Sequence, residues 1–309
     1  MEEAALSESS ASGWGCGHIL LLSFLSYLLF ALCSRARHSS ESFVEGWRGT
    51  KFWKSFGEYF DSQIILDVNK VREDGSLTAT PADRLDAEKR YVFALYPHHA
   101  MSVGHLLSFT DANGFSKKVF AGQRRHAMAT PLFLIPFVRE LCLRYGGVDV
   151  GRPTFEKMMK EGISMFVLPG GETEQVMAQY QREEIFIRHR KGFVRLAVKY
   201  GFSVVPIYCF GEADVYNTSS ALLSFRKWLV RNLRIGLPLV YGRWGLLPYK
   251  VPFRFVVGQP IDPSSSTFAS LSEEERVDAV HSAYISGLQH IFDKYKADCG
   301  AADRNLYLH

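Results

Sequence analysis

The chain has few cysteines, and they are too scattered to form a disulfide framework or a structural zinc site. Its 309 residues include five Cys, an odd number, and no CxxC pair. Small secreted scaffolds and structural zinc sites both require closely spaced sets of ligands. We therefore expect reduced cysteines, a cytosolic setting for the folded part of the chain, and no metal centre.

A strong excess of one charge is also missing. Lys and Arg number 36 against 32 Asp and Glu, a net charge of +4, and no long basic run is present. Since nucleic-acid-binding domains concentrate basic residues on one face, we expect no nucleic-acid partner. Hydrophobic residues make up 47% and aromatic residues 14% of the chain, which is typical of a packed protein with apolar or membrane partners.

The short signatures of several common enzyme classes are absent. The sequence contains no GxSxG, GxGxxG or GxxxxGK[ST] stretch. These patterns mark the nucleophile turn of lipase-type hydrolases and the phosphate-binding loops of dinucleotide and nucleoside triphosphate enzymes. We therefore expect no tightly bound cofactor.

One long hydrophobic run is present, close to the start of the chain. The stretch from Ile19 to Cys33 carries no charge, and Arg35 and Arg37 follow it. It is slightly short for a spanning helix of about 20 residues, so a helix and a hairpin both stay open. The positive-inside rule places the rest of the chain on the cytosolic side. We predict a polar tail over 1–18 and a membrane anchor over 19–34.

A segment rich in aromatic and basic residues follows the anchor. Aromatic side chains alternate with Lys and Arg between Phe43 and Phe60. This composition is typical of a helix that lies among lipid headgroups with its aromatics inward and its cations outward. We predict that residues 35–61 form an amphipathic interfacial segment.

The remaining residues, 62–309, predict a single α/β domain with a mostly parallel sheet flanked by helices. A polar stretch, Val71–Pro81, is expected to link the anchor region to this domain. The predicted strands are Tyr91–Leu95, Ile163–Leu168, Ser203–Tyr208 and Phe253–Val257, and the predicted helices are Pro131–Tyr145, Thr154–Glu161, Gly192–Tyr200 and Glu273–Lys296.

Two histidines directly follow the first of these strands. His98 and His99 come after Tyr96 and Pro97, and the carboxyl end of a sheet strand is where α/β folds place reactive groups. An imidazole titrates near neutrality and can take a proton from a hydroxyl. A structural or merely exposed histidine is the alternative. His105 is near in sequence, but no carboxylate or Cys at ligand spacing completes a metal site.

A glycine-rich turn follows the second predicted strand. Gly170 and Gly171 allow backbone N–H groups to approach a ligand or an oxyanion, and Glu172 and Glu174 come next. An acid here can orient a histidine or a substrate hydroxyl. An ordinary strand-to-helix turn with acids in the first helical turn is the alternative.

A cluster of cations precedes the predicted helix Gly192–Tyr200. Arg190, Lys191 and Arg195 belong to a stretch with four cations and one His within eight residues, a composition suited to binding phosphates. A solvated charged face is the alternative.

Four blocks of the chain, in order, resemble the type-2 diacylglycerol acyltransferase family, which includes monoacylglycerol and wax-alcohol acyltransferases. The longest block is RKGFVRLAVKYGFSVVPIYCFGE, and the resemblance extends from Phe52 to Lys296. The four blocks are Tyr91–His99, Leu168–Gln175, Arg190–Glu212 and Ile291–Lys296.

Two positions depart from the family's His-Pro-His-Gly motif. Tyr96 stands in place of the first His and His99 in place of the Gly, so the catalytic role passes to His98. The wider glycerolipid acyltransferase superfamily has an Asp five residues after its His, where this chain has Val103. Glu174 is therefore the candidate partner of His98.

The resemblance implies an acyl-CoA-dependent O-acyltransferase that acylates the free hydroxyl of diacylglycerol to form triacylglycerol. In this reading His98 is the general base, the Gly170–Gly171 turn stabilises the oxyanion, and His99 contributes to substrate binding. Arg190, Lys191 and Arg195 would hold the CoA phosphates, and Arg152, in a stretch similar to the superfamily's acceptor element, would face the acceptor or CoA. Acyl-CoA is here a substrate and not a cofactor.

Other readings stay open. Monoacylglycerol, a long-chain alcohol or a lysophospholipid can serve as acceptor instead, and a non-catalytic lipid-binding protein is the least favoured reading. The family and the anchor imply an endoplasmic reticulum membrane protein with its catalytic domain facing the cytosol, and lipid-droplet surfaces as a second location. A plastid location and a homodimer are left open by the sequence.

Overall fold

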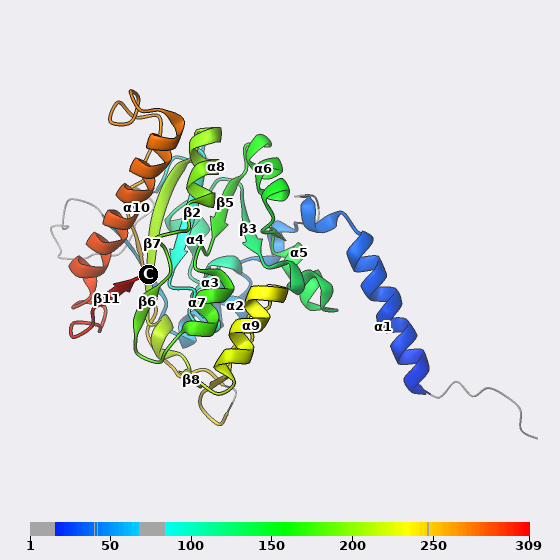
Figure 1. The fold of residues 1–309 in the computed structure, drawn as a ribbon. Helices are drawn as coiled ribbons and strands as arrows, with labels where there is room; N and C mark the ends of the chain where they lie inside the picture. Colours follow the sequence, from blue (N-terminus) through cyan, green and yellow to red (C-terminus); the bar gives the residue numbers. More distant parts are fainter. Residues whose placement is uncertain (1–15, 40, 42, 68–83, 246) are drawn as a thin grey trace, which may run out of the picture.

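The computed structural model describes residues 16–39, 41, 43–67, 84–245 and 247–309 (Figure 1). The predicted linker Val71–Pro81 and most of the predicted polar tail lie outside these residues.

The predicted anchor forms a helix, α1, over Cys16–Cys33. Among the described residues it is the one helix long and apolar enough to cross a membrane. It extends away from the rest of the molecule (Figure 1), and its Leu and Phe side chains from Leu20 to Leu32 are largely exposed. Such exposed apolar surface is stable only against lipid or another protein, so α1 indicates membrane anchoring.

A seven-stranded sheet forms the centre of the domain, in the order β1-β10-β7-β2-β5-β3-β4. Neighbouring strands are parallel except for β10 and β7, which are antiparallel. This confirms the predicted α/β architecture with a mostly parallel sheet. The strands are β1 (Gln63–Leu66), β2 (Tyr91–Tyr96), β3 (Arg124–Met128), β4 (Gly147–Asp149), β5 (Ser164–Val167), β7 (Ser203–Phe210) and β10 (Arg254–Val257).

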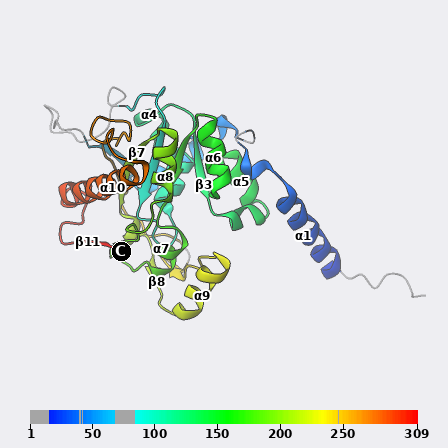
Figure 2. The same ribbon diagram turned by 45° about the horizontal axis from the view of Figure 1, so that its top comes forward.

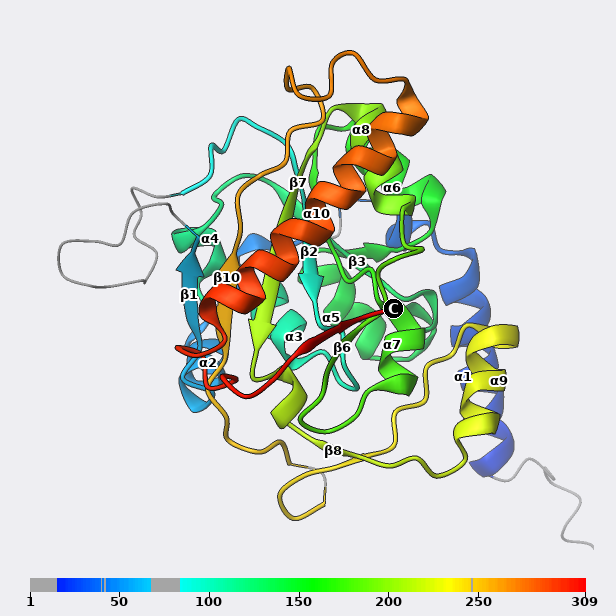
Figure 3. The same ribbon diagram turned by 60° about the vertical axis from the view of Figure 1, so that its left-hand side comes forward.

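Helices cover both faces of this sheet, and Figure 3 shows the long helix α10 crossing one of them. The central strand β2 is buried along its whole length. Val92 and Ala94 pack on one side and Phe93 and Leu95 on the other, as the period-two geometry of a strand requires. One face is covered by α6 (Arg152–Lys160), α8 (Gly192–Tyr200) and α10 (Glu273–Tyr295), the other by α2 (Lys51–Tyr59), α3 (Val103–Phe109) and α4 (Phe115–Lys118).

Shorter elements surround this core (Figure 2). Strand β11 pairs in parallel with β6, and β8 pairs antiparallel with β9. These elements are β6 (Glu183–Ile185), β8 (Asn217–Thr218), β9 (Val240–Tyr241), β11 (Leu306–Leu308), α5 (Val138–Arg144), α7 (Gly171–Met177), α9 (Leu223–Leu233) and the 3₁₀ turns η1 (Ala36–His38), η2 (Glu45–Trp47), η4 (Thr130–Leu134) and η5 (Glu212–Asp214).

One predicted helix is wrong as a single element. The stretch Pro131–Tyr145 contains the 3₁₀ turn η4 and the separate helix α5. Pro136 lacks an N–H, and Phe137 has a φ of +63°, so the chain leaves the helical path between the two. The four predicted strands, and the helices at residues 154–161, 192–200 and 273–296, are confirmed to within two residues at each end.

The aromatic and basic segment after the anchor packs partly on the domain. Phe60 is fully buried with its ring 5.1 Å from that of Phe253, and the Trp53 indole N–H donates to the Tyr145 hydroxyl. Phe52, in contrast, is 70% exposed. The contact of residues 35–61 with lipid headgroups stays a prediction.

Candidate active site

Three neighbouring parallel strands bring the sequence blocks together. In the order β7-β2-β5 the carboxyl ends of all three strands lie at the same edge of the sheet. His98 follows β2, Gly170 follows β5, and Glu212 follows β7. This edge is the usual position of a reactive site in an open α/β sheet.

His98 is half-buried, and its hydrogen bonds determine which ring nitrogen carries the proton. Nδ1 lies 2.9 Å from the carbonyl oxygen of His99 and 2.8 Å from Ser102 Oγ. A carbonyl only accepts hydrogen bonds, so Nδ1 carries the proton and Nε2 keeps its lone pair, with Ser102 Oγ 3.4 Å away. Burial lowers the pKa of the His98 imidazole below 6.5, which keeps the ring neutral at pH 7.

Ser102 was not expected from the sequence as a partner of His98. It lies four residues after His98, and its hydroxyl also donates to the His98 carbonyl oxygen at 2.9 Å. A histidine followed four residues later by a serine is the signal that would have identified it. Ser102 therefore contacts the His98 ring, where the sequence predicts Glu174.

The Glu174 carboxylate binds the backbone around His98 and not its ring. Oε1 accepts from the N–H groups of His98 at 2.5 Å and His99 at 3.4 Å, and Oε2 accepts from the Phe186 N–H at 3.2 Å. The side chain is 1% exposed. Burial raises the pKa of this carboxyl to about 7, while the backbone donors and Arg190 act in the opposite direction. Glu174 thus positions His98 through its backbone.

The glycine turn leaves the space that Glu174 occupies. A Cβ at Gly170 would lie 2.0 Å from Glu174 Oε2, so a side chain there would displace the carboxylate. Gly171 has a φ of +57°, a conformation that glycine tolerates best. Its N–H donates to the Leu168 carbonyl oxygen at 3.3 Å.

The residues on either side of His98 are both directed into the protein. Tyr96 is fully buried, and its hydroxyl donates to the Phe186 carbonyl oxygen at 3.2 Å. The His99 Nε2 lies 3.0 Å from the carbonyl oxygen of Gln179 and therefore donates to it. Burial lowers the pKa of His99 to about 4. From Tyr96 to His99, His98 is the one residue that is not fully buried.

Glu212 makes a second carboxylate–backbone contact at the same edge. It accepts from the N–H of Val103 at 2.8 Å and of Gly104 at 2.5 Å, and so caps the first turn of α3. Burial raises the pKa of its carboxyl to about 8. The helix that follows His98 is thereby fixed to the end of β7.

The predicted phosphate-binding cations separate into two groups. Arg190 lies against the glycine turn and donates to Thr173 Oγ1 at 3.1 Å. Lys191 and Arg195 form ion pairs with Asp278 and Glu274 of α10. Arg152 lies at the same edge of the sheet but after β4, three strands from β2, or about 14 Å at the usual spacing between strands. Arg190 is thus the one of these four cations that contacts the turn beside His98.

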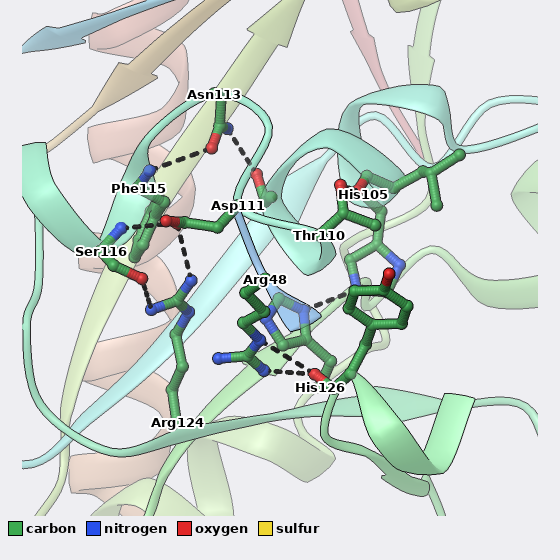
Figure 4. A network of polar contacts seen from close by, with 12 residues as sticks. Arg48, His105, Thr110, Asp111, Asn113, Phe115, Ser116, Arg124 and His126 are labelled. Carbon is green, nitrogen blue, oxygen red and sulfur yellow. Dashed lines mark hydrogen bonds and ion pairs between the residues drawn. The ribbon is translucent and has the colours of Figure 1, made fainter. Parts of the chain in front are cut away.

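His105 is buried, and its ring faces that of His126 (Figure 4). Its Nε2 lies 3.0 Å from Nδ1 of His126, and both rings are buried beside Phe166. Burial lowers the pKa of His105 to about 3. No cluster of three or more His, Cys, Asp or Glu suited to a metal ion is found among the residues the structure describes.

Comparisons with known proteins agree with the sequence resemblance. The family model described as diacylglycerol acyltransferase matches residues 15–309. The chain is 31% identical to diacylglycerol O-acyltransferase 2 of Dictyostelium discoideum, over 82% of this chain and 75% of that protein. It is 30% identical to 2-acylglycerol O-acyltransferase 3 of Homo sapiens, over 82% and 74%, and to acyl-CoA wax alcohol acyltransferase 2 of Mus musculus, over 84% and 76%.

Among solved structures, the 1-acyl-sn-glycerophosphate acyltransferase of Thermotoga maritima superposes with a TM-score of 0.40 and 15% sequence identity. That superposition covers 88% of this chain and 96% of the other.

The raised pKa of the Glu212 carboxyl predicts a pH-dependent stability. The folded chain holds this proton to about pH 8, whereas an unfolded chain releases it near 4.5, so this group lowers stability as the pH rises between those values. The limiting slope is about 1.4 kcal/mol per pH unit. Glu212→Gln, which cannot ionise, should therefore lose less stability than the wild type as the pH rises, measured by thermal unfolding in detergent.

The matched control is Glu88→Gln, because Glu88 is exposed. Its unfolding should follow the wild-type pH profile. Parallel profiles for Glu212→Gln and wild type would contradict a protonated buried carboxyl at this position.

Proposed function

Because the chain belongs to the diacylglycerol acyltransferase family, it is an acyltransferase of lipid metabolism, and we propose that its acceptor is diacylglycerol. In this proposal a fatty acyl group passes from acyl-CoA to the free hydroxyl of diacylglycerol, and the products are triacylglycerol and CoA. The observation that carries the proposal is a neutral, half-buried His98 at the carboxyl edge of the sheet, whose Nε2 keeps its lone pair.

His98 acts as the general base. Its Nε2 takes the hydroxyl proton as the acceptor oxygen attacks the thioester carbonyl, and the Nδ1–H bond to His99 stabilises the imidazolium that forms. The tetrahedral intermediate then collapses, the C–S bond breaks, and the imidazolium returns the proton to the departing CoA thiolate. No covalent acyl-enzyme is required.

The glycine turn and Arg190 serve the acyl-CoA. The Gly171 N–H makes a long bond of 3.3 Å to Leu168, which an oxyanion can replace with a shorter, charge-assisted one. Arg190, held against Thr173 beside this turn, is placed to bind a CoA phosphate. Lys191 and Arg195 can exchange their exposed ion pairs with α10 for further phosphate contacts, since such pairs contribute little free energy.

The identity of the acceptor goes beyond what membership of the family implies. Relatives named for diacylglycerol, 2-acylglycerol and wax alcohol are 30–31% identical to the chain, so monoacylglycerol and long-chain alcohols are the alternative acceptors. A lysophospholipid would need a cation for its phosphate. Arg152, whose side chain is 68% exposed at the same sheet edge, is the candidate for it.

The location follows from the anchor. Helix α1 is followed by Arg35 and Arg37, and the positive-inside rule then places the catalytic domain on the cytosolic side. We propose the endoplasmic reticulum membrane, with lipid-droplet surfaces as a second site, because a substrate and a product of the proposed reaction are membrane lipids.

Replacing the general base should abolish acyl transfer. Membranes containing the wild type should make triacylglycerol from labelled oleoyl-CoA and diacylglycerol, and His98→Ala should reduce the rate by about 10²- to 10⁴-fold. Monoacylglycerol, a fatty alcohol and lysophosphatidic acid are offered in parallel, and we expect lower rates with each.

His290→Ala is the matched control, because His290 is an exposed residue of α10. It should retain wild-type rates. Full activity of folded His98→Ala would remove His98 from the mechanism, whereas a different preferred acceptor would overturn only the choice of diacylglycerol.

The lowered pKa of His98 predicts the acidic side of the pH–rate profile. The base must be neutral, so kcat/KM should fall only as the pH drops through the imidazole pKa, which lies below 6.5. We expect the midpoint of this acidic limb below pH 6.5, measured in membranes with diacylglycerol and oleoyl-CoA. A midpoint clearly above 6.5 would mean that another group controls the reaction.

A further inference from the structure

The segment from Ser219 to Lys250, which contains α9, carries charge of one sign. It has six Lys and Arg and no Asp or Glu, although the whole chain has a net charge of only +4. It also presents four aromatic side chains to solvent, with exposed fractions of 50% for Phe225, 46% for Trp228, 53% for Tyr241 and 82% for Trp244. Exposed aromatics among cations are typical of surfaces that bind phospholipid bilayers.

The outer side of α9 exposes aromatic and basic side chains together. Phe225 and Trp228 are three residues apart, and their rings stack with centroids 6.1 Å apart and an interplanar angle of 12°. Lys227 and Arg231 are exposed beside them and lie four residues apart on one side of the helix. A helix that faces only water would expose its polar residues and bury its aromatics.

The inner face of α9 is fixed to the domain by a buried arginine. Arg226 is 2% exposed and donates to the carbonyl oxygens of Leu237 and Ser219, both at 2.7 Å, and of Val176 at 3.4 Å. Val176 belongs to α7, the helix that carries Glu174. The aromatic face is therefore held outward by a satisfied internal contact.

The α9 segment also lies beside the candidate active site. A Cβ at Gly236 would approach Gln175 Oε1 to 2.0 Å, so the two residues are in close contact. The Gln175 side-chain amide in turn donates to the Ala100 carbonyl oxygen at 3.0 Å. Ala100 is two residues from His98, so this chain of contacts connects the segment to the turn that carries the base.

The segment and the anchor lie toward the same side of the molecule. In Figure 3, α1 and α9 both lie toward the lower right, and in Figure 1 α9 lies below the sheet, between α10 on the left and α1 on the right. The end of α1 is fixed to α5 because Arg139 donates to Ser34 Oγ at 2.7 Å and lies 5.1 Å from the Phe30 ring. Phe137, directly before α5, is 83% exposed.

We propose that the α9 segment is a second membrane-contact surface, which inserts Phe225, Trp228 and Trp244 among the headgroups of an anionic phospholipid bilayer. Lys227 and Arg231 bind the lipid phosphates. With α1 as the first attachment, this contact holds the His98 edge of the sheet at the bilayer surface. The last statement rests on the proposed function, whereas the membrane contact does not.

Fluorescence of the full-length chain in vesicles tests the contact without any measurement of activity. An NBD label is attached at Trp228→Cys in a background in which Cys16, Cys33 and Cys299 are replaced by serine. The vesicles contain phosphatidylcholine and phosphatidylserine, with or without brominated acyl chains. We expect blue-shifted emission that the brominated lipid quenches and aqueous iodide does not. Ser282→Cys, an exposed position on α10, should give the reverse.

Two outcomes would overturn the proposal. Emission and quenching at position 228 equal to those at 282 would show that the aromatic face stays in water. Blue-shifted emission without quenching by brominated lipid would show that protein, such as a second copy of the chain, covers the face.

Charge reversal tests the phosphate contacts separately. Lys227→Glu/Arg231→Glu should reduce quenching by brominated lipid in anionic vesicles at least about 2-fold, and added salt should reduce wild-type quenching in the same direction. Lys89→Glu/Lys160→Glu, at two exposed positions, is the charge-matched control and should leave quenching unchanged. Equal quenching in both variants would remove the two cations from the contact. If no variant transfers acyl groups, the proposed function fails while these readouts still decide the membrane contact.

Discussion

The arrangement of the candidate site depends on one buried carboxylate that accepts three backbone hydrogen bonds. Glu174 accepts hydrogen bonds from the N–H groups of His98, His99 and Phe186. It therefore connects helix α7 to the turn after β2 and to the residue that follows β6. Backbone donors are held by the fold itself, so they position a turn more rigidly than a flexible side chain would. Burial also disfavours the charged form of this side chain and raises the pKa of its carboxyl to about 7. Glu212 repeats this use of a carboxylate at α3.

This constraint explains why the two departures from the family motif leave His98, the proposed base, in place. Tyr96 points into the core and shares Phe186 with Glu174, since its hydroxyl donates to the Phe186 carbonyl oxygen. His99 is fixed by Gln179. With both neighbours directed inward and the backbone held by Glu174, the half-buried His98 ring lies at the sheet edge with its Nε2 lone pair retained.

Much of this fold could be predicted from local patterns, and the failures have physical causes. Long apolar runs identified the central strands because a parallel sheet is buried on both faces. Strand β3 was missed because its sequence, RRHAM, reads as a solvated charged stretch. Arg124 is in fact buried, paired with Asp111 at 3.2 Å and lying 5.0 Å from the Phe115 ring. These contacts in the folded chain bury a charged stretch that the local sequence pattern assigns to the surface.

In the candidate site, too, local patterns predict some features and not others. His98, the glycine turn and Glu174 lie at one edge of the sheet, because neighbouring parallel strands share their carboxyl ends. The partner of each group was not predictable. A carboxylate near a histidine suggests a ring contact, whereas Glu174 binds backbone N–H groups and the shorter Ser102 reaches the ring. Only the path of the turn in three dimensions distinguishes these possibilities.

The central claim is that Glu174 acts through His98, and a double-mutant cycle tests it most directly. The rate of acyl transfer is measured for the wild type, Glu174→Gln, His98→Ala and the double variant, with folding of each verified by thermal unfolding. If Glu174 only positions the base, Glu174→Gln slows the wild type but has no further effect once His98 is absent. Equal factors for Glu174→Gln in both backgrounds would contradict this account and give Glu174 a role of its own.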